Sequence, residues 1–217
     1  MSSEAHIKDS MDRMYRLTRH IYDASRKYYL LGRDHLIDNL NAGNGEHVCE
    51  VGCGTARNLI KLAREYPAAH FYGLDASDEM LKTAQKSLDR NGMKRIKIAQ
   101  AYAQSFDPSA LFGLTKPLNK IFFSYSLSMI PPWRESIDHA CNLLPSGGEI
   151  HIVDFGDMAG LPEWFKKFLY MWLRLFHVYH KPEILEYLRK MSSEGRGKLT
   201  FTPLYKGYAW YAVLKKN

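Results

Sequence analysis

The stretch of residues 47–58 constrains the fold of this chain more than any other. An apolar run interrupted by Glu50 leads into Gly52 and Gly54, and an apolar pattern at helical spacing follows, formed by Leu59, Ile60, Leu62, Ala63 and Tyr66. Because glycine has no Cβ, the two glycines allow a sharp turn and the close approach of a ligand to the main chain. The stretch therefore predicts a strand, a tight turn and a helix whose first N–H groups can bind a ligand.

Two nucleotide-binding motifs share this outline, and neither fits. A dinucleotide fingerprint needs a third glycine three residues after the second, and Arg57 stands there. A P-loop needs Gly-Lys followed by Ser or Thr, which does not follow this turn. A glycine-rich turn that binds no ligand remains the alternative.

Residues 70–75 predict a second strand that ends in Asp75. Ser77 is a good N-cap for a helix that opens with Met80 and Leu81. Asp75 follows Gly54 by 21 residues, and a carboxylate at the tip of a neighbouring parallel strand can accept both ribose hydroxyls of a nucleoside. Its alternative role is to cap the next helix.

Composition favours one intracellular domain with a short appended element. The chain has 217 residues, of which 46% are hydrophobic. Cys49, Cys53 and Cys141 form no metal-ligand pattern and no disulfide framework, so we expect small core residues in a reducing cytosol and no bound metal. Residues 1–12 are polar and charged, so we do not expect them to form a signal peptide.

The order of apolar segments predicts the rest of the fold. A helical region over residues 14–40, broken at Gly32, precedes a loop at 41–45, and further strands are expected at 96–101, 120–125 and 149–155. Strands that alternate with helices pair in parallel and are covered on both faces. Strands at 198–205 and 208–214, joined around Lys206 and Gly207, add an antiparallel hairpin.

An acid before the glycine turn, followed by strands in this order, resembles the class I methyltransferases that use S-adenosylmethionine (SAM) and release S-adenosylhomocysteine (SAH). The resemblance implies an α/β, Rossmann-like, mostly parallel seven-stranded sheet with a C-terminal antiparallel hairpin. It also implies two parts of the chain, a helical segment 1–45 that caps the cofactor site and a methyltransferase domain at 46–217.

The same resemblance assigns roles to residues near the strand ends. Glu50 closes the first strand, and the turn Gly52, Cys53 and Gly54 approaches the methionine part of SAM. Asp75 takes the ribose hydroxyls, while Ala76 and Met80 flank the adenine. Tyr102 stands where the family usually has an acid for the adenine amine, Ala103 follows with a backbone N–H, and Gln104 is a substitute for the acid. Ser124 and Tyr125 face the methyl donor.

Narrower motifs resemble the betaine-lipid N-methyltransferases, which trimethylate the amine of a diacylglyceryl-homoserine lipid. They lie at residues 21–23, 28–33, 124–133, 151–156, 160–165 and 204–209. Related quinone and lipid methyltransferases carry a basic residue before the first strand. By this resemblance, Arg33 is expected to pair with the SAM carboxylate. The alternative is that Arg33 is an ordinary surface residue of a helix. Two functions compete with methylation of a lipid amine. The first is methylation of a soluble small molecule or a quinone, and the second is non-catalytic binding of SAM or RNA. Nucleic acid is not expected as a partner.

Methylation of an amine needs a neutral nucleophile in line with the donor, so orientation supplies much of the rate. Tyr125, Asp154 and Asp157 are the candidates for a base, whereas His151 is expected to be structural. Pro131 and Pro132 are interpreted as a helix start.

The C-terminal quarter is basic and contains an amphipathic helix. Residues 160–217 hold eleven lysines and arginines against four glutamates. Residues 164–179 place aromatic and aliphatic side chains on one helical face, with Lys166, Lys167, Arg174 and His177 largely between them. This helix either faces lipid at an anionic membrane or covers the sheet. The first alternative implies a cytoplasmic protein that is peripheral at the inner membrane.

Overall fold

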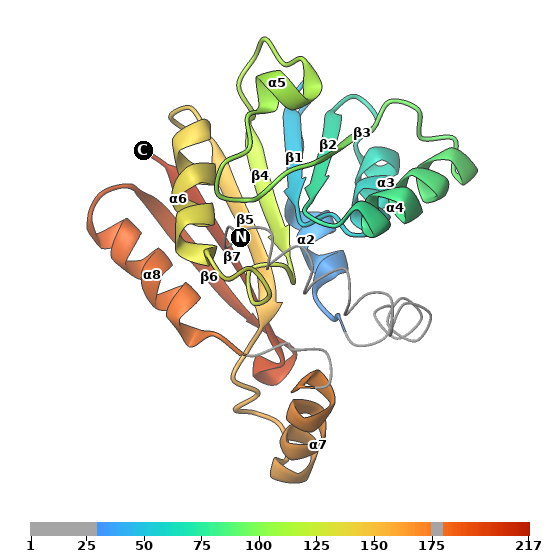
Figure 1. Ribbon diagram of the computed structural model, residues 1–217. Helices are drawn as coiled ribbons and strands as arrows, with labels where there is room; N and C mark the ends of the chain where they lie inside the picture. Colours follow the sequence, from blue (N-terminus) through green and yellow to red (C-terminus); the bar gives the residue numbers. More distant parts are fainter. Residues whose placement is uncertain (1–29, 175–179) are drawn as a thin grey trace, which may run out of the picture.

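The computed structural model describes residues 30–174 and 180–217, and it contains one mixed sheet in the order β3-β2-β1-β4-β5-β7-β6 (Figure 1). The strands β1 to β5 pair in parallel, and β7 runs antiparallel to both β5 and β6. The predicted class I fold is therefore confirmed. The helix expected over residues 14–29 lies outside the described part of the chain.

All seven predicted strands are present, with ends within two residues of those expected. The strands are β1 (His47–Val51), β2 (His70–Asp75), β3 (Lys97–Gln100), β4 (Lys120–Ser124), β5 (Glu149–Phe155), β6 (Gly197–Leu204) and β7 (Ala209–Lys216). The helices are α2 (Arg33–Asn39), α3 (Arg57–Glu65), α4 (Asp78–Arg90), α5 (Pro108–Phe112), α6 (Trp133–Leu143), α7 (Glu163–Arg174) and α8 (Pro182–Ser193). A short 3₁₀ turn, η1 (Tyr205–Gly207), joins the hairpin strands.

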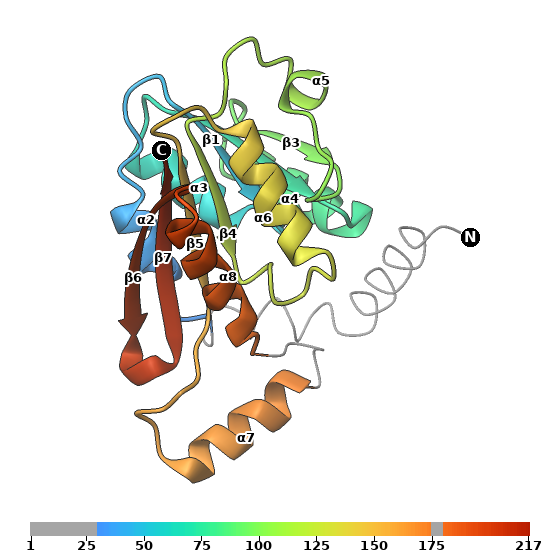
Figure 2. The same ribbon diagram turned by 90° about the vertical axis from the view of Figure 1, so that its left-hand side faces the viewer.

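Helices cover both faces of the sheet (Figures 1 and 2). Because side chains alternate along a strand, Val48 packs with α2, α3 and α4, whereas its neighbour Cys49 packs with α5, α6 and α8. Phe122 and Phe123 divide in the same way between the two clusters. The cysteines are buried and unbridged, as the sequence predicts.

The order in which strands are added to the sheet reverses between β1 and β4. From β1 the chain adds β2 and β3 on one side, then returns to add β4 and β5 on the other. In open α/β sheets, the crevice at the carboxyl ends of the strands beside such a switch is where ligands bind. The glycine turn follows β1 at this point.

Helix α7 does not cover the sheet. It lies beyond the carboxyl end of β5, away from the two helical layers (Figures 1 and 2), and joins the main core cluster through Leu169. Trp164, Phe168 and Met171 are 72%, 55% and 61% exposed, and Leu169 is buried. The interpretation of this helix as a sheet cover is therefore wrong for residues 163–174, and residues 175–179 lie outside the described part. None of the helices within the described residues is long and apolar enough to cross a bilayer.

A charged network lies near the amino-terminal ends of β4 and β5. Lys120 Nζ lies 2.8 Å from Glu149 Oε2, and His151 Nε2 lies 3.2 Å from the same oxygen. His151 Nδ1 and the hydroxyl of Tyr211 are 2.6 Å apart. The hydrogen bond with His151 and the contact with Lys120 lower the pKa of Glu149, while burial lowers the pKa of His151. His151 is thus a structural residue, as expected.

These two pKa shifts predict acid sensitivity. The usual pKa values are 6.5 for His151 and 4.5 for Glu149, and both groups bind protons less readily in the folded chain than in the unfolded chain. Their contribution to the free energy of unfolding is therefore complete above about pH 6.5 and is lost as the pH falls through the folded pKa values. We expect Glu149→Gln to cost about 1–3 kcal/mol at neutral pH, because a charged hydrogen bond is lost, and to flatten the profile below pH 4.5.

Urea unfolding over this pH range measures the effect. Glu186→Gln, at an exposed position on α8, is the matched control and should leave the profile unchanged. A Glu149→Gln profile with the wild-type slope below pH 4.5 would show that the network does not titrate as described.

Candidate active site

The turn after β1 is held by the end of β2. The N–H groups of Gly52 and Cys53 both donate to the carbonyl of Leu74, at 2.8 and 2.9 Å. Gly52 and Gly54 have φ values of +78° and +52°, which residues with a Cβ rarely adopt. A Cβ on Gly52 would lie 2.6 Å from the Cβ of Ser126. Glycine is therefore required at this position both for the turn and for the approach of the loop after β4.

Asp75 serves the turn and the cavity together. Its Oδ2 accepts a hydrogen bond from the Gly54 N–H at 2.8 Å, and its Oδ1 accepts one from the Ser77 N–H at 2.9 Å. The side chain is buried and lines a cavity. An ionised carboxylate has about four acceptor positions, so one carboxylate can accept from backbone N–H groups and from a ligand at the same time. The two roles expected for Asp75 are therefore compatible.

An apolar cavity extends from the glycine turn to the loop after β4. The empty space within it, open solvent included, is about 650 Å³. The residues predicted for the cofactor that line this cavity are Gly52, Gly54, Asp75, Ala76, Tyr102, Ala103 and Gln104. Tyr125, predicted as catalytic, lines it too. The shape and apolar lining of the cavity suit a nucleoside.

A more polar cavity lies on the other side of the same turn. Gly52 and Gly54 line both cavities, and Arg33, Glu50, Cys53 and Ser124 line the polar one. Glu50 Oε1 accepts a hydrogen bond from Asn58 Nδ2 at 2.7 Å. Arg33 is buried, only 8% exposed, so it is not a surface arginine. A charged carboxylate and a guanidinium in one cavity match the ammonium and carboxylate of an amino acid.

Two buried polar atoms in the polar cavity have no hydrogen-bond partner among the described residues. They are the hydroxyl of Ser124 and Oδ1 of Asn58. A buried polar group left unsatisfied costs about 1–3 kcal/mol, and polar atoms of a bound ligand would remove that cost. The residues present therefore fit SAM, with its nucleoside in the apolar cavity and its methionine part in the polar one.

Three predicted residues line neither cavity, namely Met80, Asp154 and Asp157. Asp157, a candidate base, accepts a hydrogen bond from the Ala159 N–H at 3.0 Å through its Oδ1. Met80 packs in the core with Ala84 and Leu88 of the same helix. Asp154 is buried behind the loop after β4, where Oδ2 accepts from the Ser128 N–H at 3.1 Å and Oδ1 from the Phe155 N–H at 2.8 Å. Burial raises the pKa of Asp154 to about 6. The contacts of Asp154 favour a role in positioning the loop after β4. The role of Asp154 as a base stays a prediction.

Tyr125 forms a wall of the apolar cavity. Its φ is +55°, an uncommon conformation for a non-glycine residue that is often found at functional sites. Its hydroxyl donates to the carbonyl of Leu31, and its ring packs edge-on against Phe155 at 4.6 Å. Burial, and then the charge of Asp154, raise the pKa of Tyr125 well above its usual value. The phenol therefore stays protonated and suits a donor better than a base.

Sequence reasoning missed part of each cavity. Met129, Ile130, Pro131 and Pro132 line the apolar cavity; α6 begins at Trp133, so the prolines start a helix as predicted, and they also shape the site. The polar cavity includes Thr55, Arg57, Asn58, Thr83 and Ser87.

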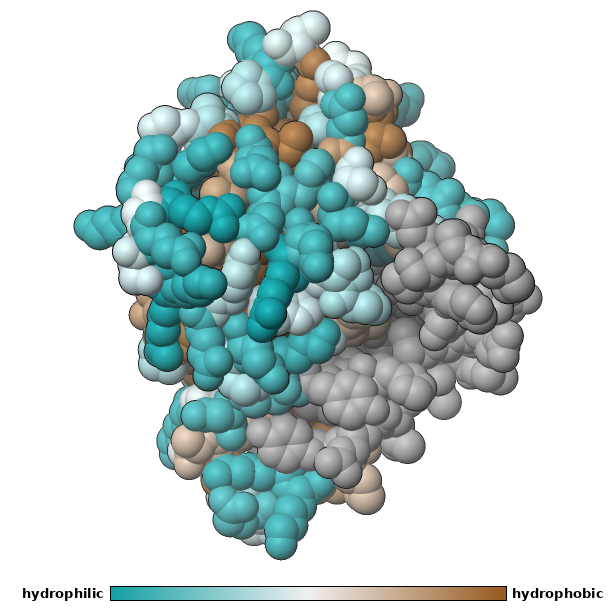
Figure 3. All heavy atoms as spheres, turned by 60° about the vertical axis from the view of Figure 1, so that its left-hand side comes forward, coloured by the Kyte–Doolittle hydropathy of each residue, from teal (hydrophilic) through white to brown (hydrophobic). Residues whose placement is uncertain are grey.

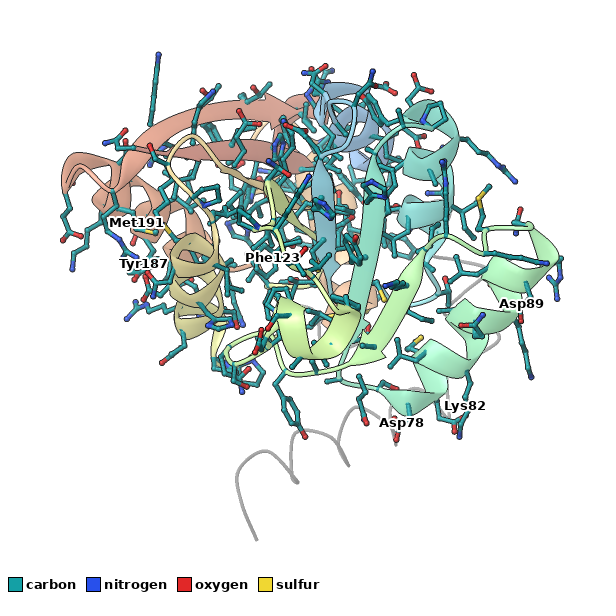
Figure 4. All side chains as sticks on the ribbon, turned by 90° about the horizontal axis from the view of Figure 1, so that it is seen from above. Asp78, Lys82, Asp89, Phe123, Tyr187 and Met191 are labelled. Atoms are coloured by element: carbon teal, nitrogen blue, oxygen red, sulfur yellow. The ribbon has the colours of Figure 1, made fainter. Side chains whose placement is uncertain are left out.

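Of the missed residues, Thr83 and Ser87 could have been found from the sequence, because their four-residue spacing places both on the same side of α4. Figure 4 shows Asp78, Lys82 and Asp89 on the outer side of α4. Thr83 and Ser87, four residues apart, lie on the opposite side of that helix. Within the described residues, no group of three or more histidines, cysteines or acids is arranged to hold a metal ion.

The sheet order, the glycine turn and the acid at the tip of β2 define a class I SAM-dependent methyltransferase. The family model described as "Methyltransferase domain" matches residues 42–194, and the chain belongs to this family.

Similar proteins include enzymes with different acceptors in their names. A demethylmenaquinone methyltransferase of Listeria welshimeri is 24% identical over 73% of this chain and 62% of its own length. A trans-aconitate 2-methyltransferase of Escherichia coli is 28% identical over 50% of this chain and 39% of its own length. The chain thus spans less than two thirds of either relative. The structure of phosphoethanolamine N-methyltransferase 2 from Haemonchus contortus has a TM-score of 0.70 at 14% identity, covering 97% of this chain and 60% of that protein.

Asp75→Ala should weaken binding of SAM and SAH by about 1–3 kcal/mol, because hydrogen bonds to a charged group are lost. Isothermal titration calorimetry with SAH measures the effect. Asp107→Ala is the matched control, since Asp107 also caps a helix through the N–H of Ser109 but lines neither cavity. Equal SAH affinity in wild type and Asp75→Ala would refute the assigned ligand contact.

Proposed function

We propose that the protein transfers methyl groups from SAM to the amine of a lipid head group, with diacylglyceryl-homoserine as the acceptor and its trimethylated betaine as the product. The motif resemblance supports this acceptor. The observation that carries the lipid part is the exposed apolar face of α7 at the carboxyl-terminal side of the sheet, the side on which both cavities lie.

Bound SAM supplies an electrophilic methyl group on a sulfonium. In this proposal Arg33 pairs with the carboxylate of the cofactor, which a planar guanidinium can grip in a bidentate way. Asp75 takes the ribose hydroxyls, and Tyr102, Ala103 and Gln104 border the adenine. The segment 1–45, which contributes Leu30 and Arg33 to the polar cavity, caps the cofactor.

The chain's own part in the reaction is to hold the amine neutral and in line. Ser124 and Tyr125 lie at the end of β4, where the two cavities meet around Gly52. An α-amino group titrates near 7.7–8.0 in peptides, so part of it is neutral without a strong base. Orientation in a closed site can recover up to roughly 7–11 kcal/mol of the barrier, and the apolar wall of Tyr125, Met129 and Ile130 limits water there.

Helix α7 would dock the protein on an anionic membrane. Trp164, Phe168 and Met171 expose apolar surface on one side of the helix, and Lys166 and Lys167 lie between them in sequence. In Figure 3, hydrophobic residues appear between hydrophilic ones at this lower end of the molecule. Reversible binding at an interface needs both apolar insertion and basic attraction. Helix α7 offers the exposed apolar side chains and the exposed Lys167, whereas Lys166 pairs with Glu163 at 2.7 Å.

Methylation of a quinone is the second candidate, favoured by the match to the Listeria enzyme over 73% of the chain. Incubation of the purified protein with SAM and lipid extracts, followed by mass spectrometry, separates the two. We expect mass gains of one to three methyl groups on an amino-acid lipid. Methylation of a quinone, with no change in the lipid amines, would overturn the proposed acceptor.

Co-sedimentation with anionic vesicles tests the docking helix. Binding should weaken with added salt, since each basic residue near the surface contributes about 1 kcal/mol within a Debye length. The variant with Lys166→Glu and Lys167→Glu should bind less than a variant with Lys82→Glu and Lys86→Glu on α4, which changes the net charge equally. Trp164→Ser with Phe168→Ser should also bind less, whereas Phe201→Ser, at an exposed aromatic on β6, should not. If the wild-type protein stays in the supernatant at low salt, the proposed binding to an anionic membrane is wrong.

A further inference from the structure

Asn58 links the acid before the glycine turn to the polar cavity. It is the second residue of α3, it is 7% exposed, and it lines this cavity together with Glu50. Its Nδ2 donates to Glu50 Oε1 at 2.7 Å. The other end of the amide, Oδ1, is buried and has no hydrogen-bond partner in the part of the chain that the structure describes. One end of this amide is therefore held, and the other is unsatisfied.

Glu50 determines which end of the amide that is. An ionised carboxylate can only accept hydrogen bonds, whereas an asparagine amide has an NH₂ donor at one end and an oxygen acceptor at the other. At a separation of 2.7 Å from Glu50 Oε1, only the NH₂ end is favourable, because the turned amide would place two oxygen atoms against each other. The acceptor Oδ1 is thus the end left for a ligand.

The missing partner of Oδ1 must be a hydrogen-bond donor. A carboxylate offers no donor, and neither does a sulfonium, which has no N–H or O–H group. The donors of SAM are the adenine amine, the ribose hydroxyls and the α-ammonium. Asp75 and the residues expected around the adenine line the apolar cavity and not the polar one. The donor at the polar end is therefore the ammonium.

The surroundings of Asn58 favour a cation. An ammonium has three donors, so it can bond to a carboxylate and to an amide oxygen together. The amino-terminal end of α3 carries a partial positive charge, which alone would disfavour an ammonium. The carboxylate of Glu50, only 1% exposed, offsets that charge from within the same cavity.

We propose that Asn58 binds the α-ammonium of SAM and SAH through Oδ1, and that Glu50 is the positioning residue that keeps this oxygen available to the ligand. The inference rests on the methionine part of the cofactor lying in the polar cavity. It does not depend on which acceptor is methylated. The buried pair of Asn58 and Glu50 thus recognises one end of the amino acid, and Arg33 in the same cavity is left for its carboxylate.

Calorimetry with SAM, SAH and an SAH analogue that lacks the α-amino group tests the contact. Wild type should bind SAH at least about tenfold more tightly than the analogue, since hydrogen bonds to a charged group are lost. Asn58→Ala should weaken SAM and SAH binding equally, by about tenfold, and should change the affinity for the analogue by less than about twofold. Asn142→Ala, at an exposed position on α6 that lines neither cavity, is the matched control and should bind all three ligands as wild type does.

Glu50→Gln tests the positioning role. The amide of the new glutamine can donate to Asn58 Oδ1, so the asparagine can turn and present its NH₂ group to the ligand. The loss of SAH affinity caused by Glu50→Gln should therefore be smaller in the Asn58→Ala background than in wild type. This coupling should be absent with the analogue, whereas a coupling of equal size for both ligands would show that the pair only supports the fold.

Asn58→Ser replaces Asn58→Ala if circular dichroism shows that the latter fails to fold. The inference is overturned by wild-type SAH affinity in the folded variant, by equal losses for SAH and the analogue, or by a loss confined to SAM, which would place Oδ1 at the sulfonium. If wild type binds neither SAM nor SAH, the proposed function fails together with this inference. If SAH binding depends on Asn58 as expected but no lipid amine is methylated, only the proposed function fails.

Discussion

The structure depends on the way the end of β2 holds the turn after β1. Two N–H groups of the turn share the Leu74 carbonyl, and the next one bonds to Asp75. These bonds fix a backbone conformation that glycine adopts at little cost, and they bring Ser126 against Gly52. The two cavities open on either side of this one turn. A change in the turn would therefore alter the nucleoside end and the amino-acid end of the site together.

The site divides by polarity in a way that suits its ligand. One cavity is lined mostly by apolar groups and has Asp75 as its charged residue, whereas the other holds Arg33, Glu50 and Arg57. An amphipathic cofactor such as SAM matches this division, because its adenine can be desolvated cheaply while its charged end keeps polar partners.

Much of this arrangement could be predicted from local sequence patterns. Strand positions follow from apolar runs between turn residues, and the place of Asp75 follows because parallel strands end at one edge of the sheet. Side-chain direction was harder to predict. Met80 turns into the core and Asp154 lies behind a loop, since a position near a strand end does not determine which way a side chain points. The pattern of residues 164–179 predicts a helix, which the structure describes over Glu163–Arg174. It does not predict what packs against that helix, because amphipathicity does not reveal what covers the apolar face.

The central claim, that the turn at Gly52 forms the cofactor site, is tested most directly by SAH binding to Gly52→Ala. Gly45→Ala is the control, because Gly45 has a similar φ of +74° but nothing within 4 Å of an added Cβ, whereas at Gly52 the added atom would lie 2.6 Å from Ser126. After circular dichroism establishes that both variants fold, calorimetry should show wild-type affinity in Gly45→Ala. In Gly52→Ala the affinity should fall at least about tenfold, or roughly 1.4 kcal/mol. Wild-type SAH affinity in folded Gly52→Ala would contradict the account.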